Sequence, residues 1–348
     1  MKNVRKARLV DVARDAGVSP ATVSRAISQP DLLSGETLAR VRQSAQRLGY
    51  SPDAAARALA SGRSMTIGAV MPTLDNAIFS RALQAMQVTL AGEGYQLLVA
   101  SHDYNAGAET EAVRTLLARG VDGLMLVGAQ RAPETLDLLR LSGVPLVLTW
   151  RSTPGVHAVT VDNERAGALA ARHLVELGHR RIGVVTGRTQ FNDRQKARLK
   201  GVRECLAAVG VALPQSLVCE QPTTLAGGRS GCAMLLELAD PPTALIAGID
   251  MIAIGCVIEA QARRLRVPGD LSVVGIDDLD MSAHLSPSLT TVHIPTAGIG
   301  AEAARKLVAL LNGEAGPLQL DLPVELVVRR SSGPPADGAI VFRDSSTR

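Results

Sequence analysis

The chain has 348 residues, of which 46% are hydrophobic and 20% are charged, and its net charge at pH 7 is +4. This composition excludes a globally disordered chain, and the length predicts two to three domains. No apolar run is long enough to cross a bilayer and no secretory signal is evident, so we expect a cytoplasmic protein. The four cysteines form no C-x-x-C pair, and we expect no metal and no cofactor.

Positive charge is concentrated at the start of the chain. Residues 1–65 contain eleven Lys and Arg against five Asp and Glu, whereas the rest of the chain is close to neutral. A small basic segment on a near-neutral body is typical of a protein that meets a polyanion at one end. Charge alone leaves a solvated basic N-terminus as an equal alternative.

The basic segment has the pattern of three short helices. Residues 9–16 form the first helix, and a Gly-Val pair interrupts it. Ser19 can cap a second helix, with Pro20 at its first position and its end near Ile27. A third helix follows a cap at Ser34. Two short helices joined by a tight turn predict a helix-turn-helix, whose second helix reads DNA bases in the major groove.

The residues of this segment carry a more specific signal. Residues 9–25 read LVDVARDAGVSPATVSR and residues 48–59 read LGYSPDAAARAL. Both closely resemble the headpiece of the LacI/GalR family of bacterial transcription regulators, and the resemblance extends to about residue 330. It implies a ligand-responsive repressor that binds a near-palindromic operator as a homodimer. It also implies a helix-turn-helix domain over 1–50, a hinge over 51–64 and an effector-binding and dimerisation domain over 65–330.

The resemblance assigns DNA contacts to both the headpiece and the hinge. Arg25 is the long donor on the second helix and the candidate for a guanine contact, the alternative being an exposed helix arginine. Hydroxyl side chains nearby suit phosphates, and Leu59 would wedge into the minor groove from a hinge helix that is too short to be stable alone. The candidate DNA-binding residues are Ser19, Pro20, Ala21, Thr22, Ser24, Arg25, Tyr50, Arg57 and Leu59.

Beyond the hinge, apolar runs alternate with helical segments. Continuous apolar runs predict strands buried on both faces, as in a parallel sheet. Two consecutive sets predict two doubly wound α/β subdomains with a cleft between them, the type I periplasmic-binding-protein fold that the LacI/GalR family shares. The predicted strands are 67–71, 96–100, 123–127, 145–148, 158–161, 181–185, 244–247 and 272–276, with helices near 79–93, 107–119 and 133–142.

Ligands of such folds bind beyond the carboxyl ends of the strands, where four of the seven aromatic residues and several polar residues fall. Any one aromatic residue alone fits a core position better, and Asp162 fits a helix cap equally well. The family pattern assigns Arg198 and Asp277 to effector contact. The candidate effector-binding residues are Asn76, Phe79, His102, Trp150, Asp162, Phe191, Arg194, Arg198 and Asp277, with Tyr104, Asp103 and Asp193 close by.

The polar residues near these strand ends favour an acidic effector. Arg194, Arg198 and His102 suit a carboxylate, although an arginine facing an aspartate also suits a polyol or a purine. Many family members carry Asn or Ser where this chain has Ile249, which cannot donate or accept a hydrogen bond. We therefore expect a small carbohydrate-like effector, with a sugar acid such as gluconate favoured over a neutral sugar.

Two other classes of protein are less compatible with the sequence. Residues 298–303 fit G-x-G-x-x-A, but no buried strand directly precedes them, so a dinucleotide-dependent enzyme is disfavoured. A transport-linked binding protein would need a signal peptide in place of the basic segment. The last segment, 331–348, is rich in Gly, Pro and Ser and lacks a leucine heptad, so we expect a flexible tail rather than a tetramerising coiled coil.

Overall fold

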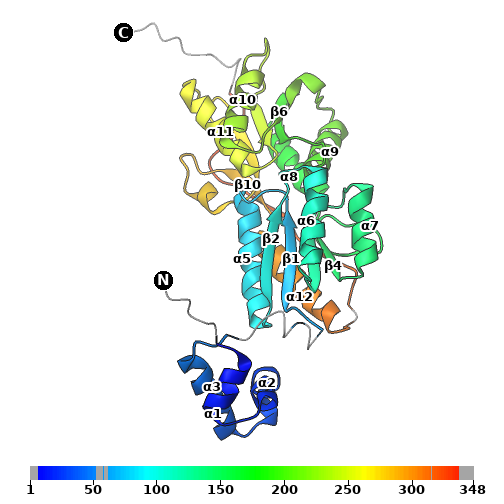
Figure 1. The fold of residues 1–348 in the computed structure, drawn as a ribbon. Helices are drawn as coiled ribbons and strands as arrows, with labels where there is room; N and C mark the ends of the chain where they lie inside the picture. Colours follow the sequence, from blue (N-terminus) through cyan, green and yellow to red (C-terminus); the bar gives the residue numbers. More distant parts are fainter. Residues whose placement is uncertain (1–6, 52–57, 59–61, 315, 337–348) are drawn as a thin grey trace. The chain divides into compact units, whose positions relative to one another are not determined.

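The computed structural model describes residues 7–51, 58, 62–314 and 316–336. It separates into two compact units, residues 1–66 and residues 67–348 (Figure 1). The first unit is a helical headpiece. The second is a body of two α/β subdomains.

The headpiece contains the three predicted helices, α1 (Leu9–Ala16), α2 (Pro20–Ser28) and α3 (Gly35–Arg47), with a short 3-10 turn, η1, between the last two. Ser19 Oγ accepts the Thr22 amide hydrogen bond at 3.1 Å and caps α2, as its position predicts. One small core holds the helices together, built from Val12, Ala13, Ala16, Val23, Ala26 and Val41.

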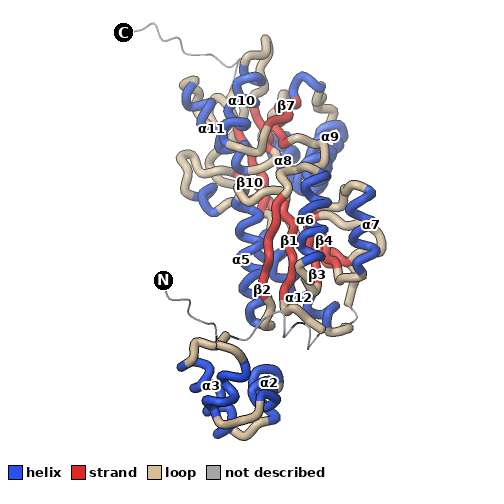
Figure 2. The backbone as a smooth tube through the Cα atoms, viewed as in Figure 1, coloured by secondary structure: helices blue, strands red, loops and turns tan. Residues whose placement is uncertain are grey.

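Each subdomain of the body is built on a six-stranded sheet. Figure 2 shows the strands in red and the helices that flank them in blue. The N-terminal sheet has the order β11-β5-β4-β3-β1-β2. Its strands are β1 (Thr66–Met71), β2 (Gln96–Ser101), β3 (Gly123–Val127), β4 (Leu146–Trp150), β5 (His157–Val161) and β11 (Gln319–Leu322). The helices of this subdomain are α5 (Ala77–Gly92), α6 (Ala106–Ala118), α7 (Pro133–Ser142) and α12 (Thr296–Leu311).

The C-terminal sheet has the order β12-β10-β9-β8-β6-β7, and only β12 runs antiparallel to its neighbour. Its strands are β6 (Ile182–Gly187), β7 (Val218–Gln221), β8 (Ala244–Ala247), β9 (Ser272–Asp277), β10 (Thr290–His293) and β12 (Glu325–Val327). Its helices are α8 (Asn163–Glu176), α9 (Asp193–Ala208), α10 (Leu225–Leu236) and α11 (Asp250–Ala262), with the short turns η2 and η3. The predicted doubly wound architecture is confirmed.

The chain passes between the two sheets at three places, after β5, after β10 and after β11. The first crossing brings residues 162 and 163 to the start of α8. Three segments therefore connect the subdomains, and connections of this kind are where a hinge motion would be absorbed. Within the described residues, no helix combines the length and hydrophobicity that a membrane span requires.

Two predictions about this architecture are wrong in detail. Strand β2 is not buried on both faces: it lies at the edge of its sheet, and Leu98 and Val99 remain 39% and 41% exposed. The segment expected to be a flexible tail from residue 331 begins as packed structure. Ser331 is fully buried, its Oγ donates to the Val273 carbonyl at 2.6 Å, and the Thr290 amide donates to it at 2.8 Å.

Candidate functional site

The headpiece exposes one face of α2. Val23 and Ala26 point into the headpiece core, so the opposite side of the helix carries Pro20, Ala21, Ser24 and Arg25 on the exposed surface. These are the residues predicted to meet DNA. The Ser19 and Thr22 hydroxyls lie 2.9 Å apart at the start of the same helix, next to its exposed amides.

The remaining DNA-binding candidates lie at the end of the headpiece and in the hinge. Tyr50 packs against the headpiece core, and its amide donates to the Ala45 carbonyl at 2.8 Å, so its ring helps to fix the end of α3. Arg57 and Leu59 lie outside the described residues, as does most of the predicted hinge helix.

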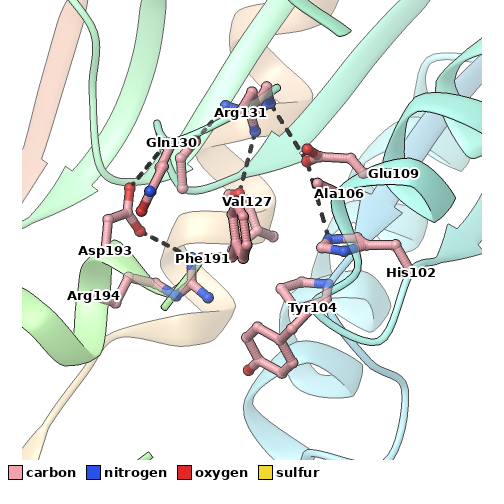
Figure 3. Close-up of a pocket in the computed structure, with 12 residues that line it drawn as sticks. His102, Tyr104, Ala106, Glu109, Val127, Gln130, Arg131, Phe191, Asp193 and Arg194 are labelled. Carbon is pink, nitrogen blue, oxygen red and sulfur yellow. Dashed lines mark hydrogen bonds and ion pairs between the residues drawn. The ribbon is translucent and has the colours of Figure 1, made fainter. Parts of the chain in front are cut away.

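The body contains a polar pocket at the carboxyl ends of the strands, shown in Figure 3. The pocket is narrow: the atom-free space between its lining residues is about 370 Å³ when open solvent is counted, and only about 20 Å³ of it can hold the centre of a water-sized sphere. Both subdomains contribute to its walls, because residues around His102 and Arg131 come from the N-terminal subdomain and residues 191–194 from the C-terminal one. Three candidate residues, His102, Phe191 and Arg194, line it together with Tyr104, Glu109, Gln130, Arg131 and Asp193.

The N-terminal wall of the pocket is a buried charge cluster. The Arg131 side chain is 1% exposed and its guanidinium donates to the Gly128 and Val127 carbonyls at 2.8 and 3.2 Å. Its Nε lies 3.5 Å from Glu109 Oε1. Burial raises the pKa of Glu109, and the nearby Arg131 charge opposes that shift.

His102 completes this wall as a neutral side chain. Burial, and then the positive charges of Arg194 and Arg131, lower the pKa of His102 to about 4. Its ring packs edge-on against Tyr104, with ring centroids 6.4 Å apart. A neutral imidazole beside two guanidinium groups can donate to or accept from a hydroxyl without adding charge.

The C-terminal wall is the first turn of α9. Asn192 caps the helix, Asp193 lies next to Arg194, and their charged groups are 3.2 Å apart. The Arg194 side chain is only 7% exposed. Two buried arginines therefore approach the pocket from opposite subdomains, an arrangement that suits a carboxylate or several hydroxyls.

A second group of candidate residues is buried beside this first turn of α9. The Arg198 guanidinium donates to Asp277 Oδ1 at 3.1 Å, to the Gly248 carbonyl at 2.7 Å and to Asn163 Oδ1 at 3.1 Å. Asp277 Oδ2 is buried and has no hydrogen-bond partner among the described residues. Burial raises the pKa of Asp277 to about 7, although Arg198 opposes the shift.

Two aromatic candidates are core residues by burial. Phe79 and Trp150 are 1% and 0% exposed, and their rings meet edge to face with centroids 5.5 Å apart. The Trp150 indole N–H is nevertheless buried without a hydrogen-bond partner in the described chain, and the Trp150 carbonyl accepts from Asn163 at 3.0 Å. Trp150 is thus linked through Asn163 to Arg198.

Backbone strain marks the same strand ends. Asp103, Tyr104, Trp150, Phe191, Asp277 and Asp278 all have positive φ, and all follow or end a strand. Non-glycine residues in this conformation are uncommon and concentrate at functional sites. Of these residues, Tyr104 and Phe191 line the pocket, whereas Trp150 and Asp277 belong to the buried group around Arg198.

Three residues singled out by sequence serve local structure instead. Asp162 is exposed, and its Oδ1 caps α8 by accepting from the Arg165 amide at 2.8 Å, so it does not line the pocket. Asn76 is buried and caps α5, accepting from the Ile78 amide at 3.2 Å. Ile249 is buried within the core of the C-terminal subdomain.

Sequence reasoning missed Glu109, Arg131 and Asn163. Glu109 lies on a helix and Arg131 in a loop, where charged residues are ordinarily solvated, so neither carries a local signal. Asn163 follows the candidate Asp162 directly. Only the cap geometry of α8 separates the exposed first residue from the buried second one. Among the described residues, no three His, Cys, Asp or Glu side chains are grouped to hold a metal ion.

Comparison with known proteins agrees with this architecture. The family model "Bacterial regulatory proteins, lacI family" matches residues 8–53, and "Periplasmic binding protein-like domain" matches residues 171–332. The chain is 32% identical to catabolite control protein A of Priestia megaterium over 93% of this chain and 98% of that protein. It is 33% identical to the HTH-type transcriptional regulator GntR of Pseudomonas aeruginosa over 95% and 98%. The lac repressor dimer bound to operator and the anti-inducer ONPF superposes with a TM-score of 0.85 at 27% identity, over 94% of this chain and 100% of that one.

A helix-turn-helix headpiece joined to a two-subdomain body with a polar pocket defines a DNA-binding regulator with a ligand-binding domain. The chain belongs to the lacI family of bacterial regulatory proteins. It is a transcriptional regulator and not an enzyme.

Proposed function

We propose that the protein is a repressor that binds a near-palindromic operator as a homodimer and that a sugar acid such as gluconate controls it. The observation that carries the effector class is the pair of buried arginines, Arg131 and Arg194, that approach one pocket from opposite subdomains. Neutral sugars need hydroxyl partners but no guanidinium to pair with a carboxylate. A carboxylate on a polyol uses both the arginines and the hydroxyl partners such as His102.

We expect effector binding and operator binding to be coupled through the relative position of the two subdomains. An effector in the pocket contacts both of them, so its binding changes their relative position. Such a change at the start of the body would decide whether the two hinge segments of a dimer, residues 51–64, pair as helices on DNA. Thermodynamics allows effector binding either to weaken or to strengthen operator binding.

Exposed apolar residues support the dimer. The edge strand β2 exposes Leu98 and Val99, and the neighbouring helix α5 exposes 63% of Val88. In the C-terminal subdomain, Met234 on α10 and Ile258 on α11 are 53% and 39% exposed. Unpaired edge strands and exposed apolar side chains are commonly covered by a second subunit. Light scattering should give a dimer, whereas a stable tetramer would contradict the proposal.

The effector class is tested by titration of tryptophan emission, because Trp150 is the one tryptophan in the chain. Gluconate should produce a saturable change, and sorbitol, a neutral polyol of the same length, should bind more weakly. A thermal-shift assay with the same compounds detects binding that leaves the emission unchanged. Tighter binding of sorbitol than of gluconate would exclude a sugar acid.

The DNA contact is tested with Arg25→Ala. On an operator selected from random DNA, this variant should lose about 1–3 kcal/mol of binding free energy and accept other bases at one position per half-site. Arg42→Ala removes another exposed arginine, on α3, and serves as the control for charge alone. Equal binding of the parent protein to operator and scrambled DNA would refute sequence-specific recognition.

A further inference from the structure

The Asp193 carboxylate joins the two subdomains across the pocket. Its Oδ2 accepts from the Ala129 amide at 2.6 Å and from the Gln130 amide at 3.3 Å. Asp193 belongs to α9 of the C-terminal subdomain, whereas these amides belong to the loop between β3 and α7 of the N-terminal one. Its other oxygen, Oδ1, lies 3.2 Å from the Arg194 guanidinium. Figure 3 shows Asp193 between Gln130 and Arg194.

The loop that receives this carboxylate is held in shape by other residues. Gly128 has a φ of +79°, and a Cβ there would lie 2.6 Å from Arg194 and 2.9 Å from Asp193, so a larger residue would close the approach. Arg131 folds back and donates to the carbonyls of residues 127 and 128, which leaves the next two amides free to face Asp193. The buried Arg131 Nε has no hydrogen-bond partner among the described residues. The loop is therefore an anion-binding subsite with a buried cation behind it.

We propose that this subsite is the carboxylate-binding end of the effector pocket and that Asp193 occupies it as an internal ligand until the acidic group of the effector displaces it. The subsite consists of the Ala129 and Gln130 amides and the Arg194 guanidinium. The chemical class of the displacing group, a carboxylate on a polyol, rests on the function proposed above.

Charge balance explains why Asp193 must leave. Within the pocket, Arg131 and Arg194 are offset by Glu109 and Asp193. A further carboxylate would place a second negative charge beside Asp193, and the two like charges would repel in a poorly solvated site. The Asp193 side chain is 14% exposed and lies on the first turn of α9, so rotation toward solvent is open to it. Displacement breaks the Asp193 link between the subdomains, and the effector's own contacts replace it.

The test compares the parent protein with Asp193→Ala. An Asp193 carboxylate that fills the subsite nine-tenths of the time weakens the apparent Kd about tenfold, so the variant should bind gluconate about tenfold more tightly. Its affinity for sorbitol should not rise. Asp240→Ala, which removes an exposed carboxylate paired with Arg181, is the matched control and should leave gluconate affinity unchanged. Weaker or unaltered gluconate binding by Asp193→Ala would overturn displacement.

A second measurement does not depend on the effector. Acetate should raise the melting temperature of Asp193→Ala by refilling the vacant subsite, and should not raise that of the parent protein. Adding Arg194→Ala should abolish the acetate effect. If the parent protein binds no gluconate, the proposed effector class is wrong. The acetate experiment still tests the subsite in that case, because a failure of acetate to stabilise Asp193→Ala would overturn the proposed carboxylate-binding site. Asp193→Ser, which suits a helix start and carries no carboxylate or amide oxygen, replaces the alanine variant if that variant does not fold.

Discussion

The Arg198–Asp277 pair shows how a single buried contact joins stability to ligand binding. The two side chains are 3% and 1% exposed, and one carboxylate oxygen of Asp277 remains without a partner in the described chain. A buried ion pair contributes little net stability, but removing one partner leaves an uncompensated charge. A free buried oxygen beside the pocket residues is suited to accept a ligand hydroxyl.

Arg198→Ala should therefore destabilise the body by about 3–5 kcal/mol at pH 8, because it leaves the buried Asp277 carboxylate without the guanidinium that opposes the rise of its pKa. Adding Asp277→Asn removes the orphaned charge and should recover part of that loss. Urea unfolding of Arg198→Ala, of Asp277→Asn and of the double variant gives a double-mutant cycle for the free energy of unfolding. Strictly additive effects would contradict a direct interaction between the side chains.

Burial of His102 predicts that the stability of the protein depends on pH. In the folded protein its pKa is about 4, against an ordinary value of 6.5, because it is buried beside two arginines. Between pH 6.5 and pH 4, His102 is protonated in the unfolded chain but remains neutral in the folded protein. The contribution of His102 to stability is thus complete above pH 6.5 and is lost as the pH falls toward 4.

The parent protein should accordingly lose stability relative to His102→Gln as the pH falls from 7 to 4.5, so the difference between their free energies of unfolding should decrease. Denaturant titrations at four or five pH values measure this difference. His284→Gln, at an exposed histidine, provides the matched control. A difference that stays constant across the range would show that His102 is solvated in the folded state.

At the scale of elements, two glycines determine how closely α8 and α9 approach. A Cβ on Gly201 would lie 1.9 Å from the Glu164 carbonyl oxygen, and one on Gly167 would lie 2.0 Å from that of Arg198. Real Cβ contacts are never so short, so the helix backbones touch directly. This contact fixes the part of α9 that carries Arg194 and Arg198.

Gly201→Ala must push the helices apart. We expect a loss of about 1–3 kcal/mol of stability from overpacking, together with weaker effector binding as Arg198 moves. Gly92→Ala, at the end of α5, meets nothing within 4 Å and should be neutral or slightly stabilising. Calorimetry and effector titration of the two variants separate the effects. Unchanged effector affinity in a destabilised Gly201→Ala would uncouple the helix contact from the pocket.

The sequence predicts which segments form helices and strands better than it predicts which of their residues are buried and what those residues contact. Apolar runs identify eight strands, including β2, but miss β7, β10, β11 and β12, which are short and partly polar. Edge position depends on strand order, which no local pattern encodes. The segment 331–333 looks like a tail because its residues are small and polar. In the fold, Ser331 and Ser332 are needed as hydrogen-bonding partners for β9 and β10. Likewise, Arg131 and Glu109 become site residues only when distant segments meet.

At the scale of the whole molecule, the pocket and the DNA-binding surface belong to different units of the chain. A signal between them requires that the effector and the operator each bind one arrangement of the body more tightly than another. The coupling free energy is then a property of the whole protein. In regulated proteins it typically corresponds to a change of about 5- to 150-fold in affinity.

Reciprocity gives the sharpest test of this coupling. If the effector changes the operator Kd by some factor, saturating operator must change the effector Kd by the same factor in the same direction. Operator binding measured with and without effector, and Trp150 emission titrated with and without operator, give the two factors independently. Asp193→Ala should keep them equal to each other even where it changes their size, because the equality follows from thermodynamics and the size from the contacts that join the subdomains. An effector that binds the pocket and leaves operator affinity unchanged would contradict the proposed regulation, since equal affinity for both arrangements shifts no equilibrium.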